Sequence, residues 1–285
     1  MGADLRKLRV QAGISAEQAA EVLECSVSKI SRLETGIGVP RTRDVRDLIE
    51  LIGGEAVKSS EVLLKLAEAG RAQPWYHQLS DLLNSTMQRF FDLESGASEE
   101  LVFGGAWVPG LLQTPSYAEA LFRAFGPDRS DEDIKRRVEL RMGRKQVLTD
   151  PDAPLKLTAI VDESVLLRSV GGPEVMREQL KVFRAAVEDP FDNVEVLLLP
   201  FSAGMQKLLA GDLTLLRFEG GVEDVVLAEG HTAQGFEERP EAVVRMAAMF
   251  EEALRATVGG TAFVDCLAGL IDELKHAESS ATHVH

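Results

Sequence analysis

The chain has 285 residues, 45% of them hydrophobic, so it is long enough for about two domains with a sizeable core. Its formal net charge of −15 argues against a chain that binds nucleic acid along its whole length, but the acid is unevenly spread. Residues 1–73 hold 11 Lys and Arg and 11 Asp and Glu and are neutral, and the rest of the chain carries the whole excess.

Cysteine spacing and hydropathy exclude further classes of protein. Cys25 and Cys266 lie far apart, which excludes a disulfide scaffold and a cysteine-based zinc site and fits a reducing compartment. There is no charged-then-apolar leader at Met1 and no apolar run long enough to span a bilayer. We therefore expect a soluble, cytoplasmic protein that does not associate with a membrane.

The first predicted element is a helix over residues 4–12. Leu5 and Leu8 form its inner face, and Arg6, Lys7 and Arg9 are expected on the outside. These basic residues are either an ordinary solvated face or contacts to a DNA backbone.

Residues 13–36, GISAEQAAEVLECSVSKISRLETG, predict two short helices joined by a tight turn. Ser15, followed three residues later by Gln18, forms a capping box at the start of the first helix. Ser26 can cap the second helix, which buries Ile30 and Leu33. Apolar residues recur at helical spacing in the first helix and allow the close packing of a helix-turn-helix: Ala16, Ala19, Ala20 and Leu23. An ordinary two-helix piece of a bundle is the alternative.

The second of these helices would meet DNA, the predicted partner. The N-terminal end of such a helix enters the major groove, so its outward residues are the predicted base-reading set: Val27, Ser28, Ser31 and Arg32. Arginine pairs with guanine O6 and N7, serine with either kind of base edge, and valine with a thymine methyl. The predicted phosphate contacts are Ser15, Ser26, Lys29, Arg41 and Arg43.

This stretch resembles the Xre-type (Cro and phage-repressor-like) DNA-binding domains. Their pattern runs G-x-S-x-x-x-x-A and then S-x-x-x-I-S-R-x-E-x-G, matched here by Gly13, Ser15, Ala20, Ser26, Ile30, Ser31, Arg32, Glu34 and Gly36. Glu24 stands where the family often has a turn glycine, and a left-handed conformation there would cost roughly 1 kcal/mol. Ala16 and Val27 stand where many members carry glutamine, so neither glutamine contact carries over.

Two more helices are predicted to complete the N-terminal domain. Residues 41–52 carry apolar residues at helical spacing and are followed by Gly53 and Gly54. Residues 61–69 form the next helix. We therefore expect a five-helix helix-turn-helix domain over residues 1–73.

The second part begins with helices. Residues 75–96 are predicted as one long amphipathic helix, and residues 103–114 as a structured loop before a helix that Pro115 starts. Residues 131–149 are predicted as a helix with a solvated basic face: Lys135, Arg136, Arg137, Arg141, Arg144 and Lys145.

After Pro154 the pattern alternates between strands and helices. Strands are predicted at residues 155–161, 194–199, 213–218 and 225–228, and helices at 163–167, 173–188, 240–257 and 262–276. The expected fold class is mainly α with α+β: the helix-turn-helix domain is followed by an α+β domain with a small sheet, residues 75–278. Residues 279–285 are expected to form a frayed tail.

The second part also resembles a domain of unresolved biochemistry that follows Xre-type modules in many actinobacterial regulators. The resemblance rests on WVPGLLQT (107–114), VELRMGRKQVL (138–148), DE (162–163), GGPEVMREQL (171–180) and LLLPFSAG (197–204). Proteins with this domain are often described as antitoxin-like, and the resemblance implies a small partner protein encoded nearby. Lys145 and Gly143 depart from the residues common at their positions and weaken any inference from the basic helix face.

No motif nominates a reaction. The sequence has no phosphate-binding loop, no dinucleotide-binding glycine pattern, no nucleophile elbow and no histidine pair with metal-ligand spacing, so we expect no enzyme activity, no cofactor and no metal. Asp162 and Glu163 end a predicted strand and either form a site or cap the next helix. Four large apolar residues in a proline-glycine loop either line a ligand or partner pocket or fill the core: Trp107, Leu111, Leu112 and Tyr117.

The function expected from the sequence is a DNA-binding transcriptional regulator. Its N-terminal domain reads an operator, and its C-terminal domain forms a homodimer and receives a signal from a small protein or a metabolite. The alternative is an antitoxin-like interaction protein that sequesters a small partner, with DNA binding secondary.

Overall fold

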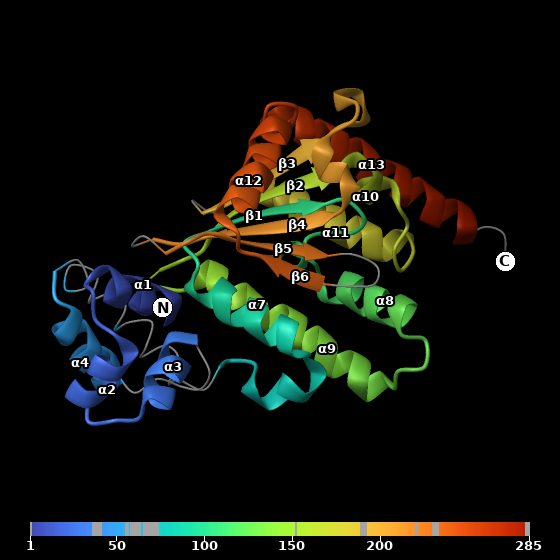
Figure 1. The fold of residues 1–285 in the computed structure, drawn as a ribbon. Helices are drawn as coiled ribbons and strands as arrows, with labels where there is room; N and C mark the ends of the chain where they lie inside the picture. Colours follow the sequence, from blue (N-terminus) through green and yellow to red (C-terminus); the bar gives the residue numbers. More distant parts are fainter. Residues whose placement is uncertain are drawn as a thin grey trace. The chain divides into compact units, whose positions relative to one another are not determined.

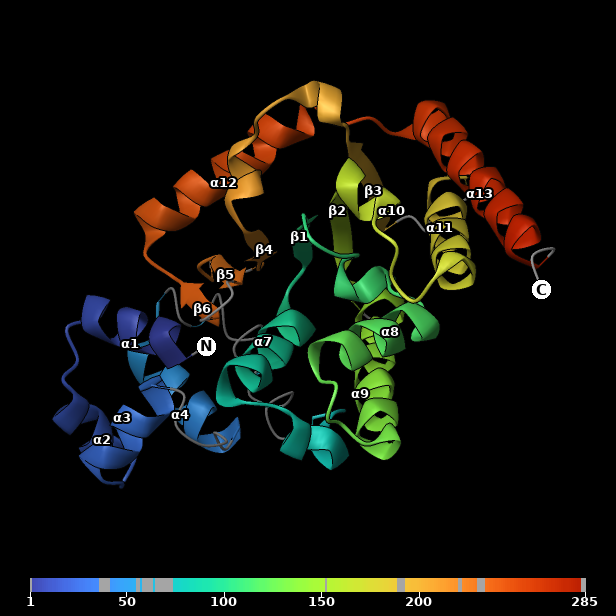
Figure 2. The same cartoon turned by 90° about the vertical axis from the view of Figure 1, so that its right-hand side faces the viewer.

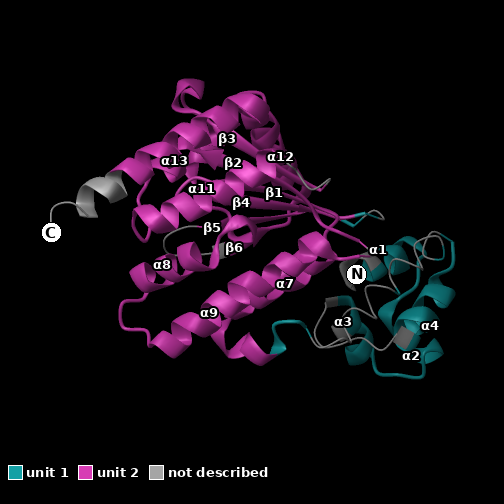
Figure 3. Ribbon diagram, turned by 180° about the vertical axis from the view of Figure 1, so that it is seen from behind, with its two compact units in different colours: residues 1–77, 219–222 teal, residues 78–218, 223–285 magenta. Residues whose placement is uncertain are grey.

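The computed structural model describes residues 2–35, 42–54, 57, 64, 74–151, 153–188, 193–219, 222–229 and 234–282. The chain divides into two compact units, shown in different colours in Figure 3. The N-terminal unit is residues 1–77 with 219–222, and the C-terminal unit is residues 78–218 with 223–285. In the described parts of both units, no helix is long and apolar enough to cross a membrane.

The N-terminal unit is a helical domain around one apolar core. Its helices are α1 (Gly2–Gln11), α2 (Ala16–Val22), α3 (Val27–Thr35) and α4 (Thr42–Ile52) (Figure 1). Their inner faces meet in a core of Leu5, Ala19, Ala20, Ile30, Leu33, Val45, Leu48 and Ile49. Gly53 and Gly54 follow α4 with positive φ angles of 65° and 52°, as the sequence predicts for a helix stop. Apart from Leu64, the predicted fifth helix at 61–69 lies outside the described residues.

The turn between α2 and α3 carries the predicted caps. Ser15 Oγ accepts a hydrogen bond from Gln18 N (3.1 Å), and Gln18 Oε1 accepts one from Ser15 N (2.7 Å), which completes the capping box. Ser26 Oγ accepts from Lys29 N at 3.2 Å and caps α3. Glu24 takes a φ of +47°, so the glycine-free turn does adopt the left-handed conformation.

Arg9 is not on the outside of α1, and the prediction that placed it there is wrong. Only 6% of it is exposed, and its guanidinium forms two hydrogen bonds with the buried Glu34 carboxylate, Nε–Oε1 at 2.5 Å and Nη2–Oε2 at 2.9 Å. Arg9 Nη1 also donates to the Ile14 carbonyl. The pair joins α1 to α3, which are far apart in sequence, so helical periodicity gave no sign of it.

The C-terminal unit is built on a mixed six-stranded sheet of order β3-β2-β1-β4-β5-β6. The strands are β1 (Glu99–Gly104), β2 (Lys156–Asp162), β3 (Val194–Leu199), β4 (Asp212–Arg217), β5 (Val225–Glu229) and β6 (Gln234–Glu237). β1 pairs parallel with β2 and antiparallel with β4, so the strand direction reverses between β1 and β4. β2 to β5 fall within a residue or two of their predicted positions, whereas β1 and β6 were not predicted.

Helices cover both faces of this sheet, as the turned view in Figure 2 shows. On one face α12 (Pro240–Leu254) packs over Leu101, Phe103, Leu215 and Val226. On the other face α11 (Pro173–Glu188) and α13 (Gly260–Thr282) pack over β2 and β3. Side chains alternate along β1, with Leu101 and Phe103 toward α12 and Glu100 and Val102 toward the other face.

The remaining helices are α7 (Ser85–Gly96), α8 (Pro115–Phe125), α9 (Asp131–Gly143) and α10 (Glu163–Leu167). Thr114 caps α8, whose first residue is Pro115, and Asp162 caps α10 by accepting from Ser164 N at 2.9 Å. Asp162 therefore acts as the helix cap that the sequence offered as one of its two roles.

Three predicted boundaries are wrong. The helix predicted at 75–96 is a short 3-10 helix, His77–Leu82, followed by α7, because Asn84 accepts from Met87 N (2.8 Å) and starts a new helix. The helix predicted at 131–149 ends at Gly143 and continues as the 3-10 helix Arg144–Thr149. α13 extends to Thr282, into the segment predicted as a frayed tail.

Candidate functional site

The outer face of α3 carries the predicted base-reading residues. Ile30 and Leu33 are 1% and 7% exposed and face the core, as the sequence predicts. Val27 is 42% exposed, and Ser28 and Ser31 are also exposed. Arg32 lies in α3, but its side chain is outside the described part of the structure.

The predicted phosphate contacts stand in different surroundings. The Arg43 side chain is 87% exposed, and its Nε lies 3.5 Å from Asp47 Oδ2. Lys29 forms an ion pair of 2.7 Å with Asp44, so a phosphate must compete with that carboxylate. Ser15 and Ser26 use their hydroxyl oxygens as helix caps, and Arg41 is outside the described residues.

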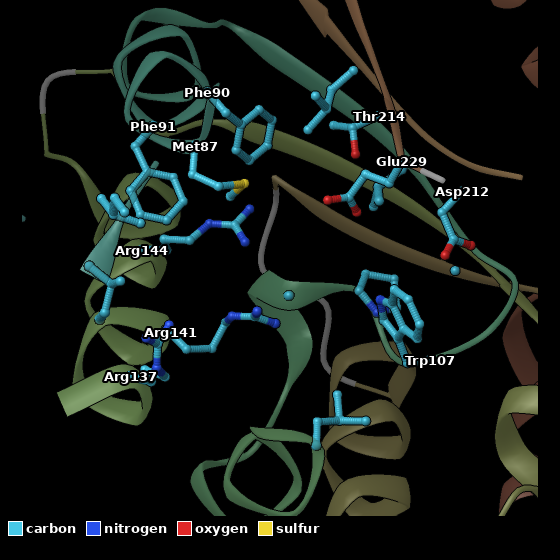
Figure 4. A pocket seen from close by; sticks show the side chains of 18 of the residues that line it. Met87, Phe90, Phe91, Trp107, Arg137, Arg141, Arg144, Asp212, Thr214 and Glu229 are labelled. Carbon is cyan, nitrogen blue, oxygen red and sulfur yellow. The ribbon is translucent and has the colours of Figure 1, made fainter. Parts of the chain in front are cut away.

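A second candidate site is a cavity of about 350 Å³ inside the C-terminal unit. It lies between α7, α8 and α9 on one side and β1, β4 and β5 on the other (Figure 4). Its apolar walls include Met87, Phe90, Phe91, Val102, Trp107, Leu121, Phe122 and Phe125. Its volume is near the lower end of the range of small-molecule pockets.

Of the four apolar residues predicted to line a pocket, only Trp107 lines this cavity. Leu111, Leu112 and Tyr117 are 2%, 5% and 1% exposed and belong to the main core. Tyr117 is turned inward at the capped start of α8, where its hydroxyl accepts a hydrogen bond from Val108 N at 3.3 Å. These three residues therefore have the core-filling role that the sequence left open.

Arg144 is buried in the wall of the cavity, so the prediction of a solvated basic face is wrong for it. Only 7% of the residue is exposed, and it forms two hydrogen bonds with Glu94, Nη2–Oε1 at 2.5 Å and Nε–Oε2 at 3.1 Å. The guanidinium also lies 5.1 and 5.3 Å from the ring centroids of Phe90 and Phe91. A Cβ on Gly110 would lie 2.5 Å from Arg144 Nη1, so a glycine leaves the space that this guanidinium needs.

Arg137 and Arg141 extend the basic wall along α9. Arg137 Nε donates to Asp133 at 2.7 Å, whereas Arg141 has no ion pair with any described residue. Arg141 Nη1 donates to the neutral Gln113 amide oxygen at 2.7 Å, and its guanidinium lies 5.2 Å from the Phe122 ring centroid. Burial, followed by the charge of Arg144, lowers the pKa of Arg141 to about 10, so it remains cationic at neutral pH.

Carboxyl groups line the sheet side of the cavity. Asp212 on β4 and Glu229 on β5 are directly opposite each other in the antiparallel register. Asp212 Oδ1 accepts from Gly105 N at 3.0 Å, and burial raises its pKa. Glu100 on β1 is 2% exposed, and burial and the charge of Glu94 raise its pKa well above the ordinary value. No group of three or more His, Cys, Asp and Glu among the described residues could hold a metal ion.

Sequence reasoning missed the cavity because its charged residues come from separate elements. Glu94 and Arg144 are 50 positions apart, and a run of arginines on one helix ordinarily marks a solvated face. The only local sign was the spacing of three between Arg141 and Arg144, which puts both on one side of the helix.

The comparisons with known proteins assign both parts of the chain. Residues 1–61 match the helix-turn-helix domain family HTH_31, which is typical of DNA-binding regulators, and residues 87–267 match the family described as domain of unknown function DUF5753. No curated protein matches the chain, and no solved structure matches it. Because the second match spans more than half of the sequence, this chain belongs to the DUF5753 family and carries a helix-turn-helix domain before the family domain.

Proposed function

We propose that this protein is a sequence-specific transcriptional regulator that reads an operator with α3 and receives a signal through its C-terminal unit. The observation that supports the proposal is the two-sided helix α3, which turns Ile30 and Leu33 inward and exposes Val27, Ser28 and Ser31. α3 is the second helix of the matched helix-turn-helix domain, the one that enters a major groove in this motif.

Each residue of α3 has a proposed role on DNA. Val27 contacts a thymine methyl, Ser28 and Ser31 bond to base edges, and Arg32 pairs with guanine. Arg41 and Arg43 bind phosphates just after the reading helix, and Lys29 does so when it leaves Asp44. No catalytic step is assigned to either unit.

Dimerisation through the C-terminal unit belongs to the same proposal. The N-terminal domain is neutral overall, so one copy gains little from the general attraction of DNA for basic proteins. Two copies on half-sites about 34 Å apart would combine two weak contacts into useful affinity. The signal that changes this binding is a small partner protein or a metabolite.

The test is footprinting of the full chain on its own promoter. We expect the unaltered chain to protect the promoter below micromolar concentration. Arg32→Ala should lose about 1–3 kcal/mol of binding free energy together with its preference for particular bases, whereas Arg43→Ala should bind all sequences more weakly by the same factor. Arg184→Ala is the matched control, since Arg184 is an exposed, ion-paired arginine on α11 of the other unit. Absence of protection by the unaltered chain, or an equal loss in the control, would overturn the proposal.

A further inference from the structure

The cavity of the C-terminal unit has one basic and one acidic side. Figure 4 shows Arg141 projecting into it from α9 and Glu229 from the opposite side, beside Asp212. Aromatic side chains also line the cavity, including Trp107 and Phe122. A ligand that fits this cavity therefore carries both a positive and a negative group on an apolar body.

Arg141 is the cationic group with capacity for a ligand. Arg144 and Arg137, its neighbours in the cavity wall, are each held by an acid, Glu94 and Asp133. Arg141 bonds instead to the neutral Gln113 through one of its five N–H groups. A planar guanidinium without a carboxylate partner binds a ligand carboxylate through two parallel hydrogen bonds.

The acidic side of the cavity carries two neighbouring carboxyl groups. Asp212 and Glu229 are directly opposite on neighbouring antiparallel strands, where like charges destabilise the pairing. Gly105 N satisfies one oxygen of Asp212. The charges of Arg141 and Arg144 act on Glu229 from across the cavity. An ammonium group of a ligand beside Asp212 and Glu229 would meet carboxylate oxygens, whereas an anion would meet like charge.

The apolar centre sets the size and shape of the ligand. Trp107 and Phe125 meet edge-to-face with ring centroids 5.5 Å apart, and the Arg141 guanidinium rests on Phe122. A volume of about 350 Å³ admits a molecule with one small apolar body but not a peptide or a nucleotide chain.

We infer that this cavity binds a small organic zwitterion of about the size of an aromatic amino acid, with its carboxylate on Arg141, its ammonium group near Asp212 and Glu229, and its apolar body beside Trp107. The inference rests on the proposed function in one respect: the ligand would be the metabolite signal of that function. Binding itself requires no DNA.

Trp107 makes the test direct. The chain has two tryptophans, so a Trp75→Phe background of the full chain leaves Trp107 as the only indole emitter, at the cavity wall. The probe is L-phenylalanine, titrated against Trp107 fluorescence, with 3-phenylpropionate and 2-phenylethylamine as analogues that each lack one charge. We expect saturable binding of L-phenylalanine and at least tenfold weaker binding of both analogues. Calorimetric titration of the unaltered chain should give the same order.

Variants assign each charge to its side of the cavity. Arg141→Met should weaken L-phenylalanine at least tenfold and leave 2-phenylethylamine unchanged, while Glu229→Gln should weaken L-phenylalanine and leave 3-phenylpropionate unchanged or stronger. Lys135→Met is the control on the same helix and should bind as the unaltered chain does, because Lys135 is exposed and does not line the cavity. The analogue series needs no variant, so it decides the matter even if Arg141→Met folds poorly.

Two results would overturn the inference: no saturable change with L-phenylalanine below about 10 mM, or binding of either analogue as tight as that of L-phenylalanine. Both are measured without DNA. A chain that binds the probe but gives no footprint would sink the proposed function alone, and a chain that footprints but does not bind the probe would sink this inference alone.

Discussion

The Glu100 carboxyl group is buried in the sheet where β1 lines the cavity. Its partners in the neighbouring strands are Leu157 on β2 and Leu216 on β4, both fully buried, and its Oε2 accepts no hydrogen bond from any described residue. Burial, with the charge of Glu94, raises its pKa, so the folded protein holds this proton more tightly than the unfolded chain does. Stability must therefore fall as pH rises from the ordinary value of 4.5 toward the folded pKa.

Glu100→Gln should remove this pH dependence, because the amide stays neutral at every pH. We expect the variant to be more stable than the unaltered chain at pH 8, and the difference in the free energy of unfolding to shrink toward pH 4.5. That difference at high pH should be about 1.4 kcal/mol for each pH unit between the folded and unfolded pKa of Glu100. Urea unfolding at several pH values measures it.

The neighbouring Glu99 supplies a control of opposite sign. Burial acts to raise its pKa, but hydrogen bonds from Arg217 and Lys156 outweigh burial and lower it. The stabilisation that ionised Glu99 provides is thus lost as pH falls. Glu99→Gln should therefore lower the free energy of unfolding most near neutral pH. A Glu100→Gln variant that behaves like Glu99→Gln would contradict the burial argument.

Glu24 is the one described non-glycine residue with a positive φ, +47°. Glu24→Gly should relieve that strain, whereas Glu21→Gly, at an exposed position within α2, should cost about 1 kcal/mol of helix propensity. We expect the two variants to differ by about 1–2 kcal/mol in local stability, measured by amide hydrogen exchange in α2 and α3. Equal effects would mean that the turn relaxes around glutamate at no cost.

At the scale of whole elements, α7 depends on the residue that caps its N-terminus, Asn84. Asn84 Oδ1 accepts a hydrogen bond from Met87 N, and the helix that follows carries Met87, Phe90 and Phe91 into the wall of the cavity. Asn84→Ala should lower the free energy of unfolding by about 1 kcal/mol, and Asn84→Asp should largely retain it, as measured by urea denaturation. If Asn84→Asp lost as much as Asn84→Ala, the side-chain cap would not be the cause.

The elements show which parts of the fold the sequence could predict. β2 and β3 are largely apolar runs, and the two short helices of the helix-turn-helix carry their own capping residues, so local pattern was enough to predict these elements. β1 begins with Glu99 and Glu100, and these charges hid a central strand. The spacing of apolar residues over 75–96 is helical on both sides of Asn84. Only the hydrogen bond that Asn84 accepts as an N-cap shows that a new helix begins there.

The candidate sites divide in the same way. The reading face of α3 follows from helical period alone, because Ile30 and Leu33 fix which side is buried. The cavity depends on pairing between distant residues, and no local rule says that Glu94 forms an ion pair with Arg144 while Arg141 forms none with any residue that the structure describes.

For the whole molecule, the uneven charge predicts how DNA binding responds to salt. The excess of acidic residues lies outside residues 1–73, and within that range 11 Lys and Arg are balanced by 11 Asp and Glu, so the domain brings no net positive charge to the phosphates. A dimer with about four phosphate contacts should lose roughly 100-fold in affinity between 50 and 200 mM salt, measured by fluorescence anisotropy. Affinity that does not change with salt would rule out the phosphate contacts assigned to Arg41 and Arg43.

The alternation along β1 also fixes the position of the whole sheet. If β1 slipped by one residue against its neighbours, every side chain would change faces, and Glu100 would enter the apolar layer beneath α12, among Leu199, Leu215 and Phe250. There the carboxyl group would lose its hydrogen bond with Glu94 and the nearby charge of Arg144, and burying a carboxyl group without any partner costs several kcal/mol. Glu100 thus penalises misaligned sheets while the chain folds, whatever occupies the cavity afterwards.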